Sequence, residues 1–312
     1  GAVLSGQGGF IEAVRKLSEL PSDVPVTMGQ QGAFASFFGT DPLNLLGVII
    51  LTSLGTWGLP QMVHKFYAIK SEKAIKTGTI VSTFFAVIVS GGCYFLGGFG
   101  RLFDAEALYK ADGSVMYDAI VPSMLSTLPD LLIGVVIILV LSASMSTLSS
   151  LVLTSASTLT LDFIKGNIVK EMNDKKQLIY IRVLIVFFIV ISVVLALNPP
   201  TFIAQLMGIS WGALAGAFLA PFLYGLYWKG VTRAGVWASF LCGVGITVSN
   251  MFFKFIASPI NAGAAAMIAG LIITPVVSLV TPKINAAFVN KIFQCYDNTA
   301  KVSSKEYLKE EA

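Results

Sequence analysis

The sequence predicts an all-α, polytopic membrane protein. Of its 312 residues, 55% are hydrophobic and only 12% are charged, which is about half the charge content of a soluble domain. The mean hydropathy is +0.80. Because about 20 apolar residues span a bilayer as a helix, long uncharged stretches exclude a soluble enzyme, a nucleic-acid-binding protein and a secreted disulfide scaffold. Six such stretches cover more than half of the chain: 42–64, 77–100, 131–161, 183–228, 234–253 and 255–282.

Seven spanning helices account for these stretches. The run 183–228 is long enough for two helices, and Asn198, Pro199 and Pro200 divide it, because proline cannot continue a helix. The run 131–161 continues as a helix toward Asp162. The predicted spans lie near 43–65, 77–101, 130–160, 179–198, 202–228, 234–254 and 260–282.

The distribution of basic residues predicts the orientation. With seven spans, simple alternation places 16 of the 21 Lys and Arg residues on one side of the membrane. Because cytoplasmic loops carry the excess of Lys and Arg, that side is the cytoplasm. The segments 11–41 and 102–129 are then outside, where 102–129 forms a short helical cap. Residues 1–285 form the transmembrane domain, and 286–312 form a cytoplasmic tail, partly disordered from Asp297.

The remaining features of composition add little chemistry. The only histidine, His64, ends the first uncharged stretch and cannot form a metal site by itself. Two of the three cysteines lie in apolar runs, so no disulfide framework is indicated. The chain begins with Gly and has no signal peptide. We therefore expect a fragment that lacks its N-terminal part.

The second half of the third span is unusually rich in hydroxyl groups. Seven of the fourteen residues from Ala143 to Ala156 are Ser or Thr. Such side chains can bond back to their own helix turn, and small residues let helices approach closely. Packing alone explains most of them individually. The alternative is a site for a hard monovalent cation, which binds neutral oxygen ligands.

The first span is a poor continuous helix near its end. Gly55, Gly58 and Pro60 occur with three hydroxyl-bearing residues between Leu51 and Pro60. Proline frees a backbone carbonyl, and glycine lets the chain unwind around it. One interpretation is a proline kink. The other is a broken helix whose freed polar groups bind a solute.

Glycines predict where helices pack closely. Gly208, Gly212 and Gly216 recur every four residues on one face of the fifth span, which is typical of a packing seam. The pairs Gly91-Gly92 and Gly97-Gly98 favour the same interpretation for the second span. Tyr227 and Trp228, next to Lys229, indicate an anchor at the membrane interface.

Three motifs together resemble the sodium:solute symporter family. The run 58–66 (Gly-Leu-Pro-Gln-Met-Val-His-Lys-Phe) is similar to the family's Gly-x-Pro segment before a basic cytoplasmic loop. The run 141–149 (Leu-Ser-Ala-Ser-Met-Ser-Thr-Leu-Ser) is similar to its sodium-site helix. The run 227–235 (Tyr-Trp-Lys-Gly-Val-Thr-Arg-Ala-Gly) is similar to its Trp-Lys-x-x-Thr-x-x-Gly turn. They occur in the family's order and spacing, and the resemblance covers roughly residues 1–255.

This resemblance implies a leucine-transporter-type inverted-repeat fold. The family has two inverted five-helix repeats plus additional helices. The chain would begin near the end of the fifth core helix and retain core helices six to ten, followed by two more helices. The first core helix, with the other half of both binding sites, would be absent. The chain by itself is then not expected to transport.

The resemblance also implies two sets of site residues. The sodium ligands fall on the Ala143 carbonyl and on the Ser146 and Thr147 hydroxyls. Many relatives place a gating aromatic residue where this chain has Thr56, so aromatic gating is not implied here. The sequence after Pro60 is closer to proline- and pantothenate-type members than to sugar carriers. The solute-facing positions fall on Thr52, Thr56 and Pro60, with Trp57 beside them.

The sequence therefore predicts a sodium-coupled symporter of the plasma membrane that imports a small organic solute. The solute is expected to bear a carboxylate, as proline, pantothenate and monocarboxylates do. Sodium is the coupling ion, and no other cofactor is expected. The partners are the solute, sodium and the bilayer, and no nucleic acid. A proton-coupled or exchange carrier, a membrane sensor and an inactive structural fragment remain alternatives.

Overall fold

The computed structural model describes residues 2–63, 69, 71–103, 108–109, 115–169 and 171–296. His64 and the tail from Asp297 lie outside these residues, so the predictions made for them stay predictions. The chain divides into two compact units, each described here by itself. Unit 1 comprises Gly1–Phe10 and Phe103–Phe202, and unit 2 comprises Ile11–Leu102 and Ile203–Ala312.

The described residues are almost entirely helical, which confirms the all-α prediction. Their one extended pairing is an isolated bridge between Tyr109 and Val115. Six helices are long and apolar enough to cross a membrane. Each of them corresponds to one of the predicted spans, so the structure is that of a polytopic membrane protein. The seventh predicted span, near 43–65, differs: its helix covers only the 17 residues Pro42–Gly58. The arrangement as inverted repeats stays a prediction.

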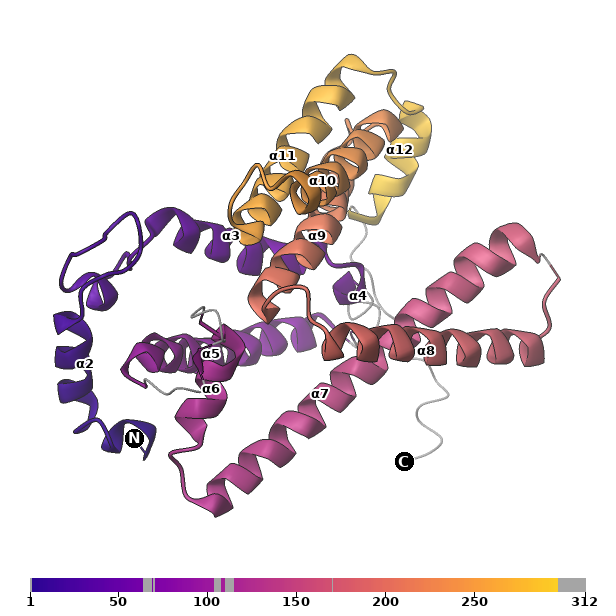
Figure 1. Cartoon of the computed structure of the whole chain (residues 1–312). Coiled ribbons are helices and arrows are strands. Elements are labelled where there is room, and N and C mark those ends of the chain that lie inside the picture. The colour runs from indigo at the N-terminus through magenta and orange to yellow at the C-terminus, as the bar shows by residue number, and fades with distance from the viewer. Residues whose placement is uncertain are drawn as a thin grey trace. The chain divides into compact units, whose positions relative to one another are not determined.

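Unit 1 is built on two long helices, α7 and α8 (Figure 1). The helix α7 spans Asp130–Thr158 and continues as the wider π-helix η5 over Leu159–Ile168, so the predicted continuation toward Asp162 is confirmed and the helix extends beyond that residue. The helix α8 spans Asp174–Leu197 and packs against α7. Two shorter helices, α1 (Ala2–Ser5) and α6 (Tyr117–Leu125), complete the unit.

The start and end of α8 follow from its sequence. The Asn173 side chain accepts a hydrogen bond from the Lys176 N–H at 2.9 Å, which caps the first turn. The helix ends at Leu197, directly before Asn198 and the two prolines. The next helix begins only at Ile203. The predicted division of the long apolar run is therefore confirmed, for the expected reason that proline cannot continue the helix.

Unit 2 contains a bundle of three packed helices (Figure 1, orange to yellow). The helix α9 spans Ile203–Tyr227, α10 spans Arg233–Phe253 and α11 spans Pro259–Val280. The turn between α10 and α11 contains Lys254 in the left-handed conformation, with φ 48°. Asn250, in the last turn of α10, closes this turn, because its side chain both accepts from the Ile256 N–H and donates to the Ile256 carbonyl.

Glycines explain how closely the three helices approach. A methyl group added at Gly212 would lie 2.5 Å from the Gly263 Cα, and one at Gly208 would lie 2.9 Å from the Ile260 N. One at Gly216 would meet Gly243 Cα at 3.1 Å. Any side chain larger than hydrogen would separate these backbones, so the predicted packing seam of α9 is confirmed.

The helix α3 (Pro42–Gly58) packs on α9 and α11. Its first turn is capped by Asp41, which accepts from the Asn44 N–H at 3.0 Å, with proline at the first helical position. Its Leu51 is fully buried in a core with four residues of α9 and α11: Ala215, Leu219, Ile260 and Met267.

The helix α5 of the same unit differs from the prediction. It spans Glu72–Gly98 and continues as the 3-10 turn η3 over Phe99–Leu102, as the second predicted span requires. However, a methyl group added at any of its paired glycines would meet no other atom within 4 Å. The expectation that these glycines form a packing seam is wrong for the described residues. They are Gly91, Gly92, Gly97 and Gly98.

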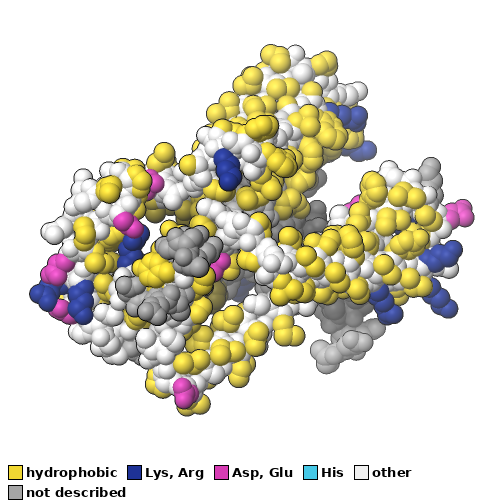
Figure 2. All heavy atoms as spheres, viewed as in Figure 1, with side chains coloured by type: hydrophobic (Ala, Val, Ile, Leu, Met, Phe, Trp, Pro, Cys, Tyr) yellow, Lys and Arg dark blue, Asp and Glu magenta, His cyan; other side chains and the backbone are white. Residues whose placement is uncertain are grey.

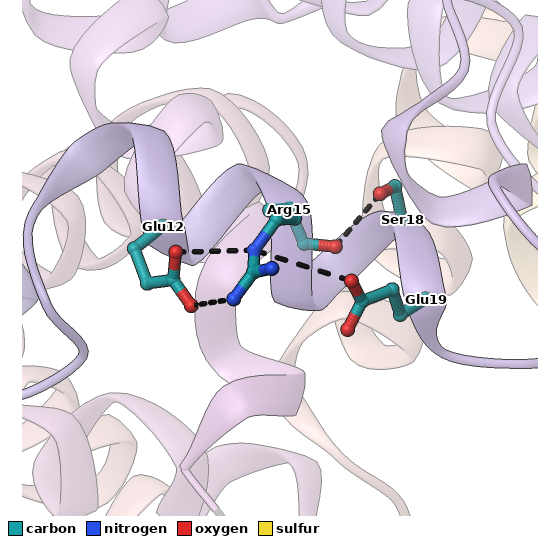
Figure 3. Close-up of polar contacts among 4 residues, drawn as sticks. All are labelled: Glu12, Arg15, Ser18 and Glu19. Atoms are coloured by element: carbon teal, nitrogen blue, oxygen red, sulfur yellow. Dashed lines mark hydrogen bonds and ion pairs between the residues drawn. The ribbon is translucent and has the colours of Figure 1, made fainter.

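Two short helices flank the spans of unit 2. The helix α12 (Ala286–Phe293) follows α11 and ends in the turn η6 (Gln294–Tyr296), so the start of the predicted tail is ordered. The helix α2 (Phe10–Glu19) lies in the segment predicted to be outside. In α2, Arg15 pairs with Glu12 and lies 4.0 Å from Glu19 (Figure 3). The hydrogen bonds that the Arg15 guanidinium donates to the Glu12 carboxylate hold the pKa of Glu12 below its usual value.

Candidate functional site

The residues predicted to bind sodium and solute lie on different units. Ala143, Ser146 and Thr147 lie in the middle of α7, in unit 1. Thr52, Thr56 and Trp57 lie in the last two turns of α3, and Pro60 begins the short helix α4 (Pro60–Val63), all in unit 2. Each group is therefore described within its own unit.

The three predicted sodium ligands converge on one point. The Ser146 Oγ donates a hydrogen bond to the Ala143 carbonyl oxygen at 2.9 Å, and the Thr147 Oγ1 donates to the same oxygen at 3.0 Å. Spacings of three and four residues place both hydroxyls on the same side of the helix as this carbonyl. One turn of α7 thus gathers three neutral oxygen atoms without any ionised side chain.

This geometry is compatible with both interpretations of the hydroxyl-rich run. The back-bonds satisfy the hydroxyl donors at little cost, as in ordinary packing. Two other hydroxyls of α7 do the same: Ser149 donates to the Met145 carbonyl and Thr154 to the Ser150 carbonyl. Yet each hydroxyl oxygen keeps acceptor lone pairs that a cation could use. Only at Ala143 do the described bonds of α7 bring two hydroxyls to one carbonyl.

The three residues predicted to bind sodium are exposed within the described structure. One helical turn supplies three oxygens, and a cation held away from water needs ligands on its other side as well. A complete site therefore requires oxygen atoms from another structural element facing this turn.

The break predicted in the first span is confirmed. The helix α3 ends at Gly58, Leu59 is extended with φ −84° and ψ 116°, and α4 begins at Pro60. The last carbonyls of a helix lack partners within it, and Pro60 has no N–H to offer. The chain is thus interrupted rather than bent beside the predicted solute residues, and the Leu59 carbonyl accepts a hydrogen bond from the Met62 N–H at 2.9 Å.

Glycines and leucine fix α3 on the bundle by one face. A methyl group at Gly58 would lie 2.7 Å from the Ala215 Cα, and one at Gly55 would lie 3.2 Å from the Trp211 ring. Together with Leu51 these residues bury the face that packs on α9 and α11. The predicted solute residues avoid this face: Thr52 and Thr56 are half-buried, and Trp57 and Pro60 are exposed.

The two threonine hydroxyls are satisfied by their own helix. The Thr52 Oγ1 donates to the Val48 carbonyl at 2.8 Å, and the Thr56 Oγ1 donates to the Ser53 carbonyl at 3.2 Å. Their lone pairs point away from these bonds and can accept from a ligand. Trp57, 60% exposed, supplies a flat apolar surface one residue further along.

Sequence reasoning missed polar residues inside the bundle. The Ser258 Oγ donates to the Asn44 Oδ1 at 3.0 Å and so joins the N-terminal ends of α3 and α11. The Oδ1 of Asn261 is buried against Gly47 and has no hydrogen-bond partner among the described residues. An asparagine within an apolar run was the available signal, because such residues join helices in membranes.

Comparison with known proteins places these features in one family. The model of the sodium:solute symporter family matches residues 1–243. A sodium/pantothenate symporter of Haemophilus influenzae is 27% identical over 240 residues, which are 76% of this chain and 47% of that protein. A sodium/proline symporter of Staphylococcus aureus is 29% identical over 259 residues, which are 78% of this chain and 48% of that protein. The chain therefore spans about half the length of these curated relatives.

Proposed function

Since this chain belongs to the sodium:solute symporter family, we propose that it forms part of a carrier that imports a small organic solute together with sodium. One observation carries the proposal. The Ser146 and Thr147 hydroxyls converge on the Ala143 carbonyl in a membrane-spanning helix. The family is one of transporters, and no enzymatic step is proposed.

The chemistry of this turn suits sodium. A monovalent hard cation is held by neutral oxygens, so no charge has to be buried when the site is empty. When sodium binds, the two hydroxyls rotate their hydrogens away from the Ala143 carbonyl and direct lone pairs to the ion. The remaining ligands come from an element that faces α7.

A site of neutral oxygens also suits coupling. It binds sodium well enough to couple and weakly enough to release it in the cytoplasm. Moving one positive charge inward is worth about 2.3 kcal/mol per 100 mV. Each ~1.4 kcal/mol corresponds to a tenfold concentration ratio. With a sodium gradient added, accumulation of the solute by a hundredfold or more follows.

We propose that the solute binds at the break between α3 and α4. The end of α3, whose last carbonyls lack partners within the helix, and the side chains of Thr52, Thr56 and Trp57 offer hydrogen bonds and an apolar surface. The relatives are named for pantothenate and proline, which both carry a carboxylate. A small carboxylate-bearing solute is therefore the proposed substrate class. We place the tail after α11 in the cytoplasm, on the count of basic residues.

The test is uptake by the full-length parent protein in proteoliposomes. The solutes are proline, pantothenate, a short monocarboxylate and a sugar, each with a sodium gradient and with potassium in place of sodium. We expect uptake of one carboxylate-bearing solute that needs sodium. Uptake driven equally well by a proton gradient would instead support a proton-coupled carrier, although the six uncharged stretches contain no Asp or Glu to carry the proton.

Variants of α7 test the site itself. In Ser146→Ala/Thr147→Ala, we expect the sodium concentration for half-maximal uptake to rise by about tenfold or more for each hydroxyl. The reason is that a bond to a charged group contributes about 1.5–3 kcal/mol. Thr154→Ala is the matched control, because Thr154 makes the same kind of back-bond two turns away. Unchanged sodium dependence in the double variant would mean that these hydroxyls only pack.

A further inference from the structure

One end of the bundle in unit 2 carries exposed cations that have no acidic partner among the described residues. Lys229 and Arg233 flank the turn between α9 and α10, Lys283 follows α11, and Lys291 lies on α12. These four residues, called the basic end below, are all exposed. No Asp or Glu occurs in the sequence from Lys175 to Tyr296. Figure 2 shows Lys and Arg side chains beside hydrophobic surface at this end of the bundle.

Hydrogen bonds make the basic end one structure rather than separate loops. The Thr232 N–H donates to the Ser278 Oγ at 3.2 Å, and the hydroxyls of Thr232 and Thr281 lie 2.7 Å apart. These bonds tie the turn between α9 and α10 to the end of α11. The short segment 281–285 then leads directly into α12.

One face of the helix α12 is attached to the turn between α9 and α10. The Lys229 Nζ donates to the Asn290 Oδ1 at 3.2 Å and lies 5.5 Å from the centre of the Phe293 ring. The Tyr296 hydroxyl donates to the Leu226 carbonyl at 2.9 Å. These contacts hold α12 beside the end of α9.

The described residues do not cover the other faces of α12. Phe288 is 58% exposed and Ile292 is 53% exposed, and their spacing of four residues places them on one face. Lys291 lies on the next face. No residue of α12 is buried. The helix is thus amphipathic, with an apolar face that the described part of the protein does not cover.

The depth of this end in the membrane identifies what covers it. The helices α9 and α11 end at Tyr227 and Val280, and α10 begins at Arg233, so the basic end lies where three membrane spans meet the headgroup layer. Tyr227 and Trp228 are of the type enriched at that level. An amphipathic helix at this depth buries its apolar face among the acyl chains and directs its lysines to phosphate groups.

We propose that α12 is a membrane-interface helix and that the basic end binds the headgroups of anionic phospholipids. Phe288 and Ile292 enter the bilayer, and Lys229, Arg233, Lys283 and Lys291 supply the positive charge that matches the lipid phosphates. The proposal concerns the membrane and does not depend on which solute or ion is transported.

The test measures which lipid lies next to Ile292. In the full-length protein, Cys93, Cys242 and Cys295 are replaced by Ser, and Ile292→Cys carries a fluorophore. Vesicles contain equal parts of phosphatidylcholine and phosphatidylglycerol, with quenching bromine atoms on the chains of only one of them. A lysine near an anionic surface strengthens association by about fivefold. We therefore expect quenching by brominated phosphatidylglycerol to exceed that by brominated phosphatidylcholine several-fold.

Two results of this measurement would overturn the proposal. Absence of quenching by either brominated lipid would show that α12 does not lie in the bilayer interface. Equal quenching by both lipids would show that the basic end does not select anionic headgroups. A label at Asn290, on the face toward Lys229, should be quenched less than the label at Ile292.

Charge variants separate lipid recognition from folding. Lys283→Gln/Lys291→Gln keeps the Lys229 contacts that hold α12, and we expect it to lower the several-fold preference for phosphatidylglycerol to nearly equal quenching by the two lipids. The matched control, Lys175→Gln/Lys176→Gln, removes two charges at the start of α8 and should leave the preference unchanged. An unaltered preference in the first variant would contradict the assignment of these lysines.

The tail is the competing occupant, and a shortened protein tests it. Residues 297–312 contain four acidic and three basic residues, so they offer little net charge to the basic end. We expect a chain that ends at Tyr296 to show the same lipid preference as the full chain. A preference that appears only after the tail is removed would mean that the tail, not the bilayer, covers this surface.

Discussion

The helices α7 and α9 are both long and apolar, yet they are covered to different extents. In the most apolar 18-residue window of α7 no residue is buried, whereas 39% of the residues are buried in that of α9. The cause is the kind of small residue that each helix carries. The glycines of α9 let neighbouring backbones come into contact, while the hydroxyl groups of α7 turn back to their own helix. The glycines of α9 thus permit close neighbours, whereas the hydroxyl-rich run of α7 keeps its polar groups satisfied within one helix.

The largest expected effect is at Gly243 of α10, which packs against the backbone of α9. A side chain added there would overlap the Gly216 carbonyl carbon in the backbone of α9, which cannot move aside without separating the helices. We expect Gly243→Leu to destabilise the bundle by about 1–3 kcal/mol or more and to lower the yield of monodisperse protein. The measurement is a thermal melt of the detergent-purified protein.

Gly245→Leu is the control on the same helix. A methyl group at Gly245 would meet no atom within 4 Å, so a side chain there points to open space. Its melting temperature should stay close to that of the unaltered protein. Equal loss of stability in both variants would show that the α9–α10 contact does not hold the bundle together.

The next largest effect is expected at Thr232, whose buried hydroxyl lies at the start of α10. Its Oγ1 accepts from the Gly235 N–H at 3.2 Å and so caps α10, while also contacting Thr281. Thr232→Val keeps the shape and removes both bonds, for an expected cost of about 0.5–2 kcal/mol. Chemical denaturation measures it. Ser71→Ala removes the exposed cap of α5 and should cost less; the reverse order would contradict the role given to burial.

On the α7 side, loss of hydroxyl groups should hardly affect stability. Ser146→Ala/Thr147→Ala removes two back-bonds within one helix and opens no packed contact. The expected change in unfolding free energy is within about 0.5 kcal/mol. The same denaturation experiment checks it. A large loss of stability would show that this turn of α7 is a packing surface after all, and any loss of transport would then need no sodium site.

The smallest effect concerns α2, outside the spans. Hydrogen bonds from Arg15, and then its positive charge, hold the pKa of Glu12 below its usual value. A lowered pKa in the folded state stabilises the helix above the ordinary glutamate pKa, and this contribution is lost as the pH falls through the lowered value. Protection of the α2 amides from exchange, corrected for the intrinsic exchange rate at each pH, should therefore fall at acid pH. Glu12→Gln should remove that pH dependence, and an equal loss of protection in this variant would assign it to another group.

The sequence by itself located six of the seven predicted spans as long apolar helices. Long uncharged runs must leave water, and Pro199 and Pro200 cannot continue a helix, so both signals act locally and need no neighbour. Gly58 and Pro60 marked an irregularity in the first span but left a kink and a break as alternatives, and the structure has the break. The three oxygens at Ala143 also lie within one turn, and helix geometry alone brings them together.

Only the tertiary structure decided which glycines are in contact. Gly208 and Gly91 are alike in sequence context, yet one packs on the backbone of α11 and the other faces open space within the described residues. The same holds for Asn261, whose position against Gly47 depends on a helix more than 200 residues away in the chain. Close packing depends on which surfaces meet, and the periodicity of one helix does not contain that information.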